Sequence, residues 1–255
     1  MSFTDFDKRM KRYELSSRQY LTRRTPVLIR IDGKAFHTFT HGMARPFDMV
    51  ITQSMQNTMK YLCENIQGCV LGFTQSDEIT LLLVDFQTVE SEAWFDYKVD
   101  KICSVSSSMA TLEFNKSFAR NSEVYRKACN SRDDAIGTIY ERALSKGALF
   151  DSRCFNVPIN DVCNAFIWRQ KDAMRNSVRQ VGHEYIGKKK LHKVSTKDTV
   201  EKLLSYGVFY DDFATELRRG SCCYKGDEGK FFIDKEIPEF TEDRNFIERW
   251  LQYED

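Results

Sequence analysis

Two aspartates lie where apolar segments of the chain give way to turns. Asp32 follows the β-branched run 26–31, and Asp77 lies in a short polar stretch between the apolar runs 69–73 and 79–84. Two carboxylates at one sheet edge repel each other unless cations lie between them, and Mg²⁺ binds one or two carboxylates together with substrate phosphates. The pair therefore suits phosphoryl transfer. Aspartates are also common as turn formers and helix caps, so their positions alone leave that interpretation open.

The segments around the aspartates predict the elements that must hold them. Runs of β-branched and apolar residues predict strands, and apolar residues at intervals of three or four predict helices. The expected order is a strand at 26–31, a helix capped by Asp48 and closed by Gly68, strands at 69–73 and 79–84, a helix marked by Phe95, Val99, Ile102 and Met109, and a strand at 153–157. This is the order of the split βαβ, or ferredoxin-like, unit of polymerase palms, so we predict an α+β fold with an antiparallel sheet and helices on one face. In such a unit the two carboxylates can converge.

Helical spacing also marks a segment before this unit and a segment after it. A short N-terminal helix is predicted from Phe3, Phe6, Met10, Tyr13 and Leu15, and a helix at 161–182 from Cys163, Ile167, Met174, Val178 and Val181. We expect a palm-like catalytic domain with its N-terminal helix at 1–159 and a mainly helical C-terminal extension with a basic loop at 160–255, packed together as one unit. The polar stretch 115–134 is predicted to be a mobile loop.

Composition limits the class of protein. The 255 residues are 42% hydrophobic and carry a formal net charge of only +1, so any basic nucleic-acid footprint must be local. No apolar run approaches the roughly 20 residues of a membrane helix, and the polar N-terminus lacks a signal peptide, so we expect a cytoplasmic protein without a membrane partner. The eight cysteines form no Cys-x-x-Cys pair, which favours reduced core thiols over zinc ligands or disulfides.

Several motifs resemble those of the tRNA-His guanylyltransferase family of 3′-to-5′ polymerases. In order and spacing they are RIDGKAFH at 30–37, RPFD at 45–48, GFTQSDE at 72–78, Trp94-Phe95 with Lys98 and Lys101, FDSR at 150–153 and WRQKD at 168–172. The resemblance covers about residues 5–225 and is specific as far as Asp172. It implies an enzyme that uses ATP to adenylylate a 5′-monophosphate on tRNA, after which the 3′-hydroxyl of GTP or another nucleoside triphosphate displaces AMP. Two Mg²⁺ ions, tRNA as a partner and a homotetramer are also implied.

The resemblance assigns roles to individual residues of this chain. Asp32, Asp77 and the backbone carbonyl of Gly33 match the metal ligands, and Glu78 matches a further catalytic acid, to which we give a supporting role because neighbouring strand residues face opposite ways. The nucleotide and its triphosphate are expected to contact Lys34, Ala35, Phe36, His37, Arg45, Asp48, Ser76, Lys98 and Lys101. Simpler interpretations are an N-cap for Asp48, a turn hydroxyl for Ser76, and solvated charges for Arg45 and the two lysines. His37 and His41 alone are a weak zinc pattern.

One motif departs from the family. Where guanylyltransferases proper have a His-Ile-Asn-Asn motif, this chain reads MRNS at 174–177, so it resembles the branch that refills missing 5′ nucleotides on truncated tRNAs by pairing against the opposite strand. Arg169, Asp172 and Asn176 share a helix face, where they either form a buried network or contact the nucleotide or tRNA. A lysine-rich loop, 186–197, suits phosphate binding unless it is simply solvated; its proposed tRNA contacts are Lys188, Lys189, Lys190 and Lys193.

Two other functions are compatible with the same residues. A palm-fold nucleotide cyclase, or another nucleotidyltransferase with a small substrate, would use the same two carboxylates but would not need a basic RNA surface. A non-catalytic tRNA-binding module would not need the carboxylates. Loss of function on replacing Asp32 or Asp77, and the nature of the nucleotide product, distinguish the three.

Overall fold

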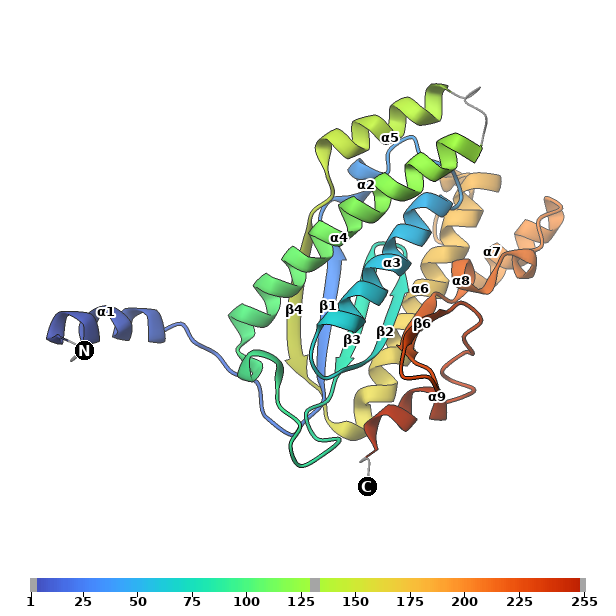
Figure 1. Ribbon diagram of the computed structural model, residues 1–255. Coiled ribbons are helices and arrows are strands. Elements are labelled where there is room, and N and C mark those ends of the chain that lie inside the picture. The colour runs from blue at the N-terminus through green and yellow to red at the C-terminus, as the bar shows by residue number, and fades with distance from the viewer. Residues whose placement is uncertain (1–3, 129–133, 253–255) are drawn as a thin grey trace.

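A six-stranded antiparallel sheet forms the centre of the molecule (Figure 1). The computed structural model describes residues 4–128 and 134–252. The strands are β1 (Val27–Gly33), β2 (Cys69–Gln75), β3 (Glu78–Leu83), β4 (Phe150–Asn156), β5 (Ser221–Lys225) and β6 (Phe231–Asp234), in the order β4-β1-β3-β2-β5-β6. The first four have the order of a split βαβ unit, so the predicted α+β, ferredoxin-like fold is confirmed.

Helices cover both faces of this sheet. Side chains of one strand alternate between faces, so Ile29 and Ile31 of β1 pack towards α3 (Met49–Asn65) and α4 (Val99–Ala128). Leu28, on the opposite face, joins the cluster that contains Phe166 of α6 (Val162–Tyr185). Helices on one face were predicted, and that holds for the helices inside the split βαβ unit. The additional layer comes from the C-terminal part of the chain, which buries the second face.

The remaining elements are short. On the α3 and α4 side lie α2 (Phe36–Phe39), the 3₁₀ helix η1 (Trp94–Tyr97) and α5 (Asp134–Lys146); η2 (Ile159–Asp161) leads into α6. After α6 come η3 (Lys188–Leu191), α7 (Thr196–Ser205), η4 (Tyr210–Asp212), α8 (Thr215–Arg218), α9 (Asn245–Glu248) and η5 (Arg249–Leu251). The C-terminal extension also contributes β5 and β6, two strands that were not predicted. The division at residues 159 and 160 stays a prediction.

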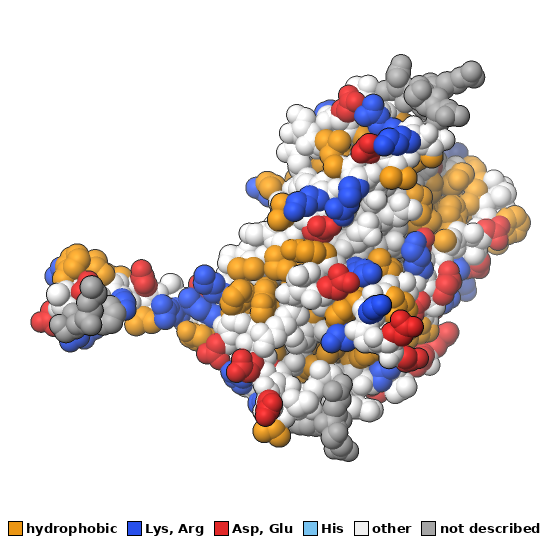
Figure 2. All heavy atoms as spheres, viewed as in Figure 1, with side chains coloured by type: hydrophobic (Ala, Val, Ile, Leu, Met, Phe, Trp, Pro, Cys, Tyr) orange, Lys and Arg blue, Asp and Glu red, His pale blue; other side chains and the backbone are white. Residues whose placement is uncertain are grey.

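The N-terminal helix α1 (Asp5–Leu15) stands away from the body of the molecule (Figures 1 and 2). Thr4 and Asp7 form a capping box that begins the helix, as two reciprocal side-chain to backbone hydrogen bonds. None of its residues is buried, and Figure 2 shows hydrophobic and charged side chains exposed together on it. The predicted helix is therefore confirmed, although Phe3 lies outside the described residues.

Two local predictions were wrong. The stretch 115–134 was expected to be a mobile loop, but 115–128 continues α4, whose buried Phe114, Phe118 and Ser122 face the core at helical spacing; 129–133 lie outside the described residues. Phe95 was placed in the same helix, but α4 begins at Val99, and Phe95 has a positive φ of 52° in η1. Tertiary burial of a narrow apolar stripe outweighed the polar composition of the stretch.

Other expectations agree with the structure. Asp48 is the N-cap of α3, since its side chain accepts hydrogen bonds from the backbone N–H groups of Val50 and Ile51. The cysteines of the described ranges are free thiols, and Cys129 lies outside those ranges. In the described part of the chain, none of the helices has both the length and the apolar character to cross a bilayer.

Candidate active site

The β2–β3 hairpin brings Asp77 beside the end of β1. Gln75 and Glu78 pair across the sheet, which leaves Ser76 and Asp77 as the turn, and Ser76 has a positive φ of 57°. The backbone N–H of Gly33 donates to the carbonyl oxygen of Asp77 at 3.1 Å. A Cβ at position 33 would lie 3.0 Å from Cβ of Asp77 and 2.5 Å from the Phe36 ring, so only glycine fits this approach. Asp32, at the end of β1, and Asp77, in the turn, line one cavity. Their joint binding of a metal stays a prediction.

The electrostatics of this edge favour a bound cation. Burial raises the pKa of Asp77 above its ordinary value, and the negative charges of Asp32 and Glu78 raise it further. A hydrogen bond from the Ser76 hydroxyl to Oδ1 of Asp77, at 3.0 Å, acts in the opposite direction. Carboxylate and backbone carbonyl oxygens are the hard donors that Mg²⁺ prefers. The donor set offered by Asp32, Asp77 and Gly33 therefore fits magnesium.

The sheet register adds charged residues that the sequence analysis did not assign. Asp151 of β4 and Glu78 of β3 are the cross-strand partners of Asp32, so the three carboxylates lie in one row on one face. Arg30 and Arg153 are paired one row further along the same face. Asp151, together with Asp32 and Glu78, raises the pKa of Arg153. On this face of the sheet, a row of three carboxylates therefore lies next to a row that contains two arginines.

Glu78 is held by two arginines. Arg30 bonds one carboxylate oxygen, and Arg169 of α6 donates to both, through Nε at 2.6 Å and Nη2 at 3.0 Å. The same Nη2 lies 2.9 Å from Oδ2 of Asp172, and Arg169 is only 7% exposed. This is the buried network foreseen as one interpretation of Arg169 and Asp172. It also supports a positioning role for Glu78, because both of its oxygens are already engaged.

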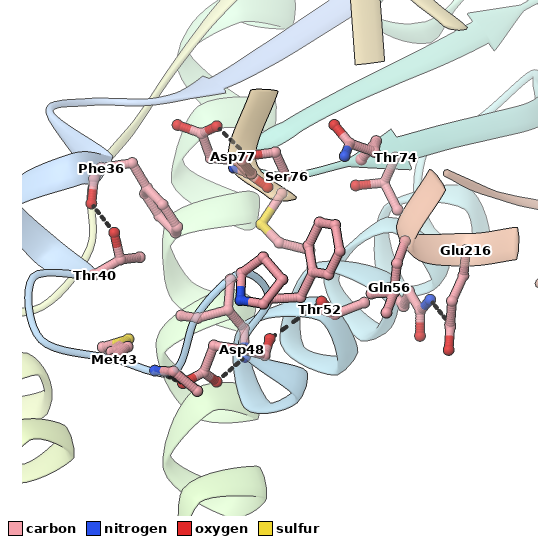
Figure 3. A pocket seen from close by; sticks show the side chains of 18 of the residues that line it. Phe36, Thr40, Met43, Asp48, Thr52, Gln56, Thr74, Ser76, Asp77 and Glu216 are labelled. Atoms are coloured by element: carbon pink, nitrogen blue, oxygen red, sulfur yellow. Dashed lines mark hydrogen bonds between the residues drawn. The ribbon is translucent and has the colours of Figure 1, made fainter. Parts of the chain in front are cut away.

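Two cavities meet at the turn of Ser76 and Asp77. The smaller of the two, about 140 Å³, extends from Asp77 towards α3 and is drawn in Figure 3. Its wall includes the predicted residues Phe36, Arg45, Asp48 and Ser76, with Met43, Pro46, Phe47, Ile51 and Met55 as apolar surface and Gln56, Gln180 and Glu216 as polar groups. An apolar cleft with a few convergent polar groups is typical of a site for a small molecule or cofactor. The other, about 220 Å³, has Asp32, Asp77, Glu78, Arg169 and Asn176 in its wall.

The segment after Asp32 offers backbone donors. Ala35 adopts a left-handed conformation, with φ at 50°, directly before α2. The first N–H groups of a helix have no acceptor within that helix, so those of Phe36 and His37 point out of its N-terminal end. The N–H of Lys34 instead donates to the carbonyl of Leu149 at 2.8 Å. The backbone N–H of Lys34 is therefore already used, whereas the predicted triphosphate contacts of Ala35, Phe36 and His37 stay predictions.

Basic residues far apart in the sequence act on His183. Burial lowers the pKa of His183 in α6, and the positive charges of Lys188, Arg179 and Arg45 lower it further. Arg45 itself is exposed and also lines the smaller cavity. Lys188 of the predicted basic loop and Arg45 of the cavity wall therefore both act on His183, a relation that spacing along the chain could not indicate.

The other predicted basic residues lie elsewhere. The helix predicted from Phe95 onward would include both Lys98 and Lys101, but Lys98 precedes α4 and its ammonium lies 3.2 Å from Asp100. Ser106 and Thr111, further along α4, are the residues that reach the Phe150–Ser152 end of β4 beside Asp32. Lys98 and Lys101 therefore lie towards the opposite end of the sheet. Within one chain, these two lysines therefore do not lie at the site predicted for the triphosphate.

The lysine-rich segment has more secondary structure than expected. Lys188, Lys189 and Lys190 form η3 and are exposed, and Lys193 follows with a φ of 60°. Lys190 is hydrogen-bonded to the Tyr206 hydroxyl at 3.0 Å. Their predicted contacts with tRNA stay predictions.

Two carboxylates where the strands of a split βαβ sheet end, next to a partly apolar cleft, are the arrangement typical of palm-type nucleotidyltransferases. The model of the tRNA-His guanylyltransferase family matches residues 7–158. A bacterial tRNA-His guanylyltransferase-like protein in complex with ATP is 35% identical, with a TM-score of 0.83, and covers 97% of this chain and 99% of its own. A structure of such a bacterial protein in complex with GTP is 33% identical, with a TM-score of 0.79 and the same coverage.

A probable tRNA-His guanylyltransferase of Dictyostelium discoideum is 27% identical over an alignment of 213 residues that covers 78% of this chain and 75% of that protein. The chain therefore belongs to the tRNA-His guanylyltransferase family, and it is a nucleotidyltransferase. The resemblance drawn from the motifs is thereby confirmed.

Proposed function

We propose that this enzyme adds nucleotides in the 3′-to-5′ direction to the 5′ end of truncated tRNA, choosing each by pairing with the opposite strand. A 5′-monophosphate is first adenylylated by ATP with release of pyrophosphate, and the 3′-hydroxyl of an incoming nucleoside triphosphate then displaces AMP. The observation that carries the proposal is the meeting of Asp32 and Asp77 at one sheet edge, beside a cleft suited to a nucleobase. Phosphoryl transfer needs mainly positioning and charge neutralisation, which such a site supplies.

Asp32, Asp77 and the carbonyl of Gly33 would hold two Mg²⁺ ions. When bound, such ions lower the pKa of an attacking hydroxyl and neutralise charge on the triphosphate. The chain itself fixes the positions of these ligands. The backbone N–H of Gly33 ties the end of β1 to the β2–β3 turn through the carbonyl of Asp77, and the Ser76 hydroxyl donates a hydrogen bond that orients the Asp77 carboxylate. Glu78, held by Arg30 and Arg169, keeps the cationic groups in place beneath them.

The nucleotide would lie in the smaller cavity with its phosphates towards Asp77. The apolar wall formed by Phe47, Ile51 and Met55 suits the flat face of a base, and the N–H groups of Ala35 to His37 together with Arg45 suit the phosphates. Both carboxylate oxygens of Asp48 accept hydrogen bonds from the protein; the donors are Ala44, Val50, Ile51 and Tyr140. Asp48 would therefore shape the cavity wall beside the nucleotide and would not bind the nucleotide itself.

Truncated tRNA is proposed as the substrate because the chain has MRNS at 174–177 in place of the His-Ile-Asn-Asn motif. Asn176 alone keeps the asparagine, and it lines the larger cavity beside Asp32 and Asp77. We also propose a homotetramer, in which Lys98 and Lys101 of one subunit would meet a substrate held by another. Light scattering of the purified protein measures the assembly.

The test is extension of a 5′-labelled tRNA lacking its first nucleotide, incubated with Mg²⁺, ATP and the nucleotide that pairs with the exposed template base. Asp32→Ala and Asp77→Ala should each lower the rate at least about 100-fold, because even residues that only support metal ligands cost 10–100-fold. Asp227→Ala is the matched control, since Asp227 is an exposed turn aspartate between β5 and β6.

Three results would contradict the proposal. Unchanged extension by both aspartate variants would indicate a binding module. A cyclic product from free nucleotide, without extension of tRNA, would indicate a nucleotide cyclase. Equal extension with matched and mismatched nucleotides would contradict the dependence on a template.

A further inference from the structure

One exposed stripe of α6 carries an aromatic ring and three cations. Trp168, Lys171, Arg175 and Arg179 follow each other at intervals of three, four and four, so they share one side of the helix. All four are exposed; Trp168 is 56% exposed, which is high for a side chain of its size, and the Arg175 side chain is 55% exposed. With a rise of 1.5 Å per residue the stripe is about 16 Å long. We call these four residues the α6 stripe.

The α6 stripe borders the larger cavity of the active site. Asp172, Ala173 and Asn176, on the adjoining face of the same helix, line that cavity together with Arg169. The Arg169 guanidinium lies 4.3 Å from the centre of the Trp168 ring and holds Glu78 with its other side. Trp168 is therefore fixed against the wall of the catalytic cavity while its ring stays open to a ligand.

The other end of the stripe leads to the basic residues that act on His183. Arg179 acts on the pKa of His183 in common with Lys188 and Arg45. Positive charge thus continues from Arg175 along the helix to η3. A path of cations that begins at an exposed aromatic ring matches the way proteins bind single-stranded nucleic acid, in which bases stack on rings and phosphates meet lysine and arginine.

We infer that the α6 stripe binds the RNA strand at the acceptor end of the substrate, with an unpaired base stacked on Trp168 and the neighbouring phosphates on Lys171, Arg175 and Arg179. This inference rests on the proposed function, because it makes the polyanionic substrate an RNA end. Trp168 is a binding residue here, and Arg169 positions it. The stripe would hold the unpaired strand beside Asp32 and Asp77 while the 5′ end of the other strand is extended.

The experiment measures binding without catalysis. The probe is a fluorescein-labelled RNA hairpin of an acceptor stem whose 5′ strand is one nucleotide short, titrated with the full-length protein in EDTA and without nucleotides. Trp168→Ala should weaken binding about 5- to 150-fold, the range found for loss of one base–aromatic stack. Trp168→Phe should bind more tightly than Trp168→Ala, and it should lose the RNA-dependent quenching of tryptophan fluorescence, a signal that a purely structural role would not remove.

The charges are tested by salt dependence. Replacing Lys171, Arg175 and Arg179 together by alanine should lower the slope of log affinity against log salt concentration by about 2, since each phosphate contact on a single strand contributes roughly 0.7. Phe6→Ala is the matched aromatic control, because Phe6 is 59% exposed and lies 5.6 Å from the Arg9 guanidinium, but belongs to the separate helix α1. It should bind the hairpin as the wild type does.

Several outcomes overturn the inference. Binding by Trp168→Ala and Trp168→Phe within twofold of the wild type does so, as does an equal loss in Phe6→Ala or an unchanged salt slope in the triple variant. Failure of the proposed function looks different: the wild-type protein would not extend tRNA, although the hairpin would still bind through Trp168. Conversely, if tRNA is extended normally and the Trp168 variants bind the hairpin as the wild type does, the inference about the α6 stripe is wrong and the proposed function stands.

Discussion

At the scale of single residues, the site depends on how closely two backbones approach. Gly33 can donate to the carbonyl of Asp77 because it has no Cβ to strike Phe36 or Asp77 itself. The same closeness buries Asp77 beside Asp32 and Glu78, so the pKa of Asp77 is raised. The fold therefore keeps two repelling carboxylates together, an arrangement that becomes favourable when a cation is bound.

This repulsion predicts a gain in stability on neutralising Asp77. Because the folded state raises the pKa of this carboxyl, it binds the proton more tightly than the unfolded chain, and the free energy of unfolding falls as the pH rises through the ordinary value of 3.8 and up to the folded pKa. In EDTA at pH 7, Asp77→Asn should melt at a higher temperature than the wild type, and the difference should shrink as the pH falls towards 4. Mg²⁺ should stabilise the wild type more than the variant. A variant that melts lower at pH 7 in EDTA would contradict this account.

At the scale of elements, α6 is tied to the sheet beneath the site by a buried ion pair. Arg169 on α6 and Glu78 on β3 are both largely buried, and Asp172 and Arg30 complete the network. Removing one partner of such a pair leaves an uncompensated charge in a partly dry environment. The link therefore fixes where the catalytic hairpin lies against α6.

A double-mutant cycle tests this link. Arg169→Met should destabilise the protein by about 3 kcal/mol because Glu78 loses its bidentate partner. Glu78→Gln combined with Arg169→Met should cost clearly less than the sum of the two single changes, as measured by urea unfolding. Arg175→Met, which removes a half-exposed partner of the same Asp172, is the control and should cost under about 1 kcal/mol. Additive effects of Arg169 and Glu78 would show that the pair is not coupled.

At the scale of the whole molecule, one sheet separates two hydrophobic cores. The core beneath α3 and α4 contains Ile29 and Met59, and the core beneath α6 contains Leu28, Phe166 and Phe240. The second core is built largely by residues after 160. A chain that ended before α6 would expose an apolar sheet face to water, which costs roughly 25 cal/mol for each Å².

Removing the C-terminal part of the chain should therefore destabilise the fold, whereas removing α1 should not. Residues 1–159 alone should lack a cooperative unfolding transition and bind the dye ANS, because the α6 face of the sheet is uncovered. Deleting residues 1–16 should leave the melting temperature within about 2 °C of the full-length protein, since α1 has no buried residue. Circular dichroism melting of both forms is the measurement. A cooperatively folding 1–159 fragment would show that the palm is independent of its extension.

Local patterns along the chain were sufficient for the elements of the palm. The β-branched runs, the Asp48 cap and the turn at Asp77 each depend on contacts between neighbouring residues, so β1 to β4 and α3 could be predicted, and with them the meeting of Asp32 and Asp77. The family motifs carried the nature of the chemistry. Short strands such as β5 and β6 have little periodicity of their own, and α4 continues through a polar stretch because only a narrow stripe of it is buried.

Register and packing between distant segments were decided by tertiary contacts. The row of Asp151, Asp32 and Glu78 depends on how β4 aligns with β1, and no local pattern encodes that alignment. Arg169 is held by Glu78, 91 residues away in the chain. Arg45 and Lys188 both act on His183 only because the fold brings their segments near α6. Backbone geometry is local and can be read along the chain, whereas the charge environment of a site is summed over every segment that the fold brings near it.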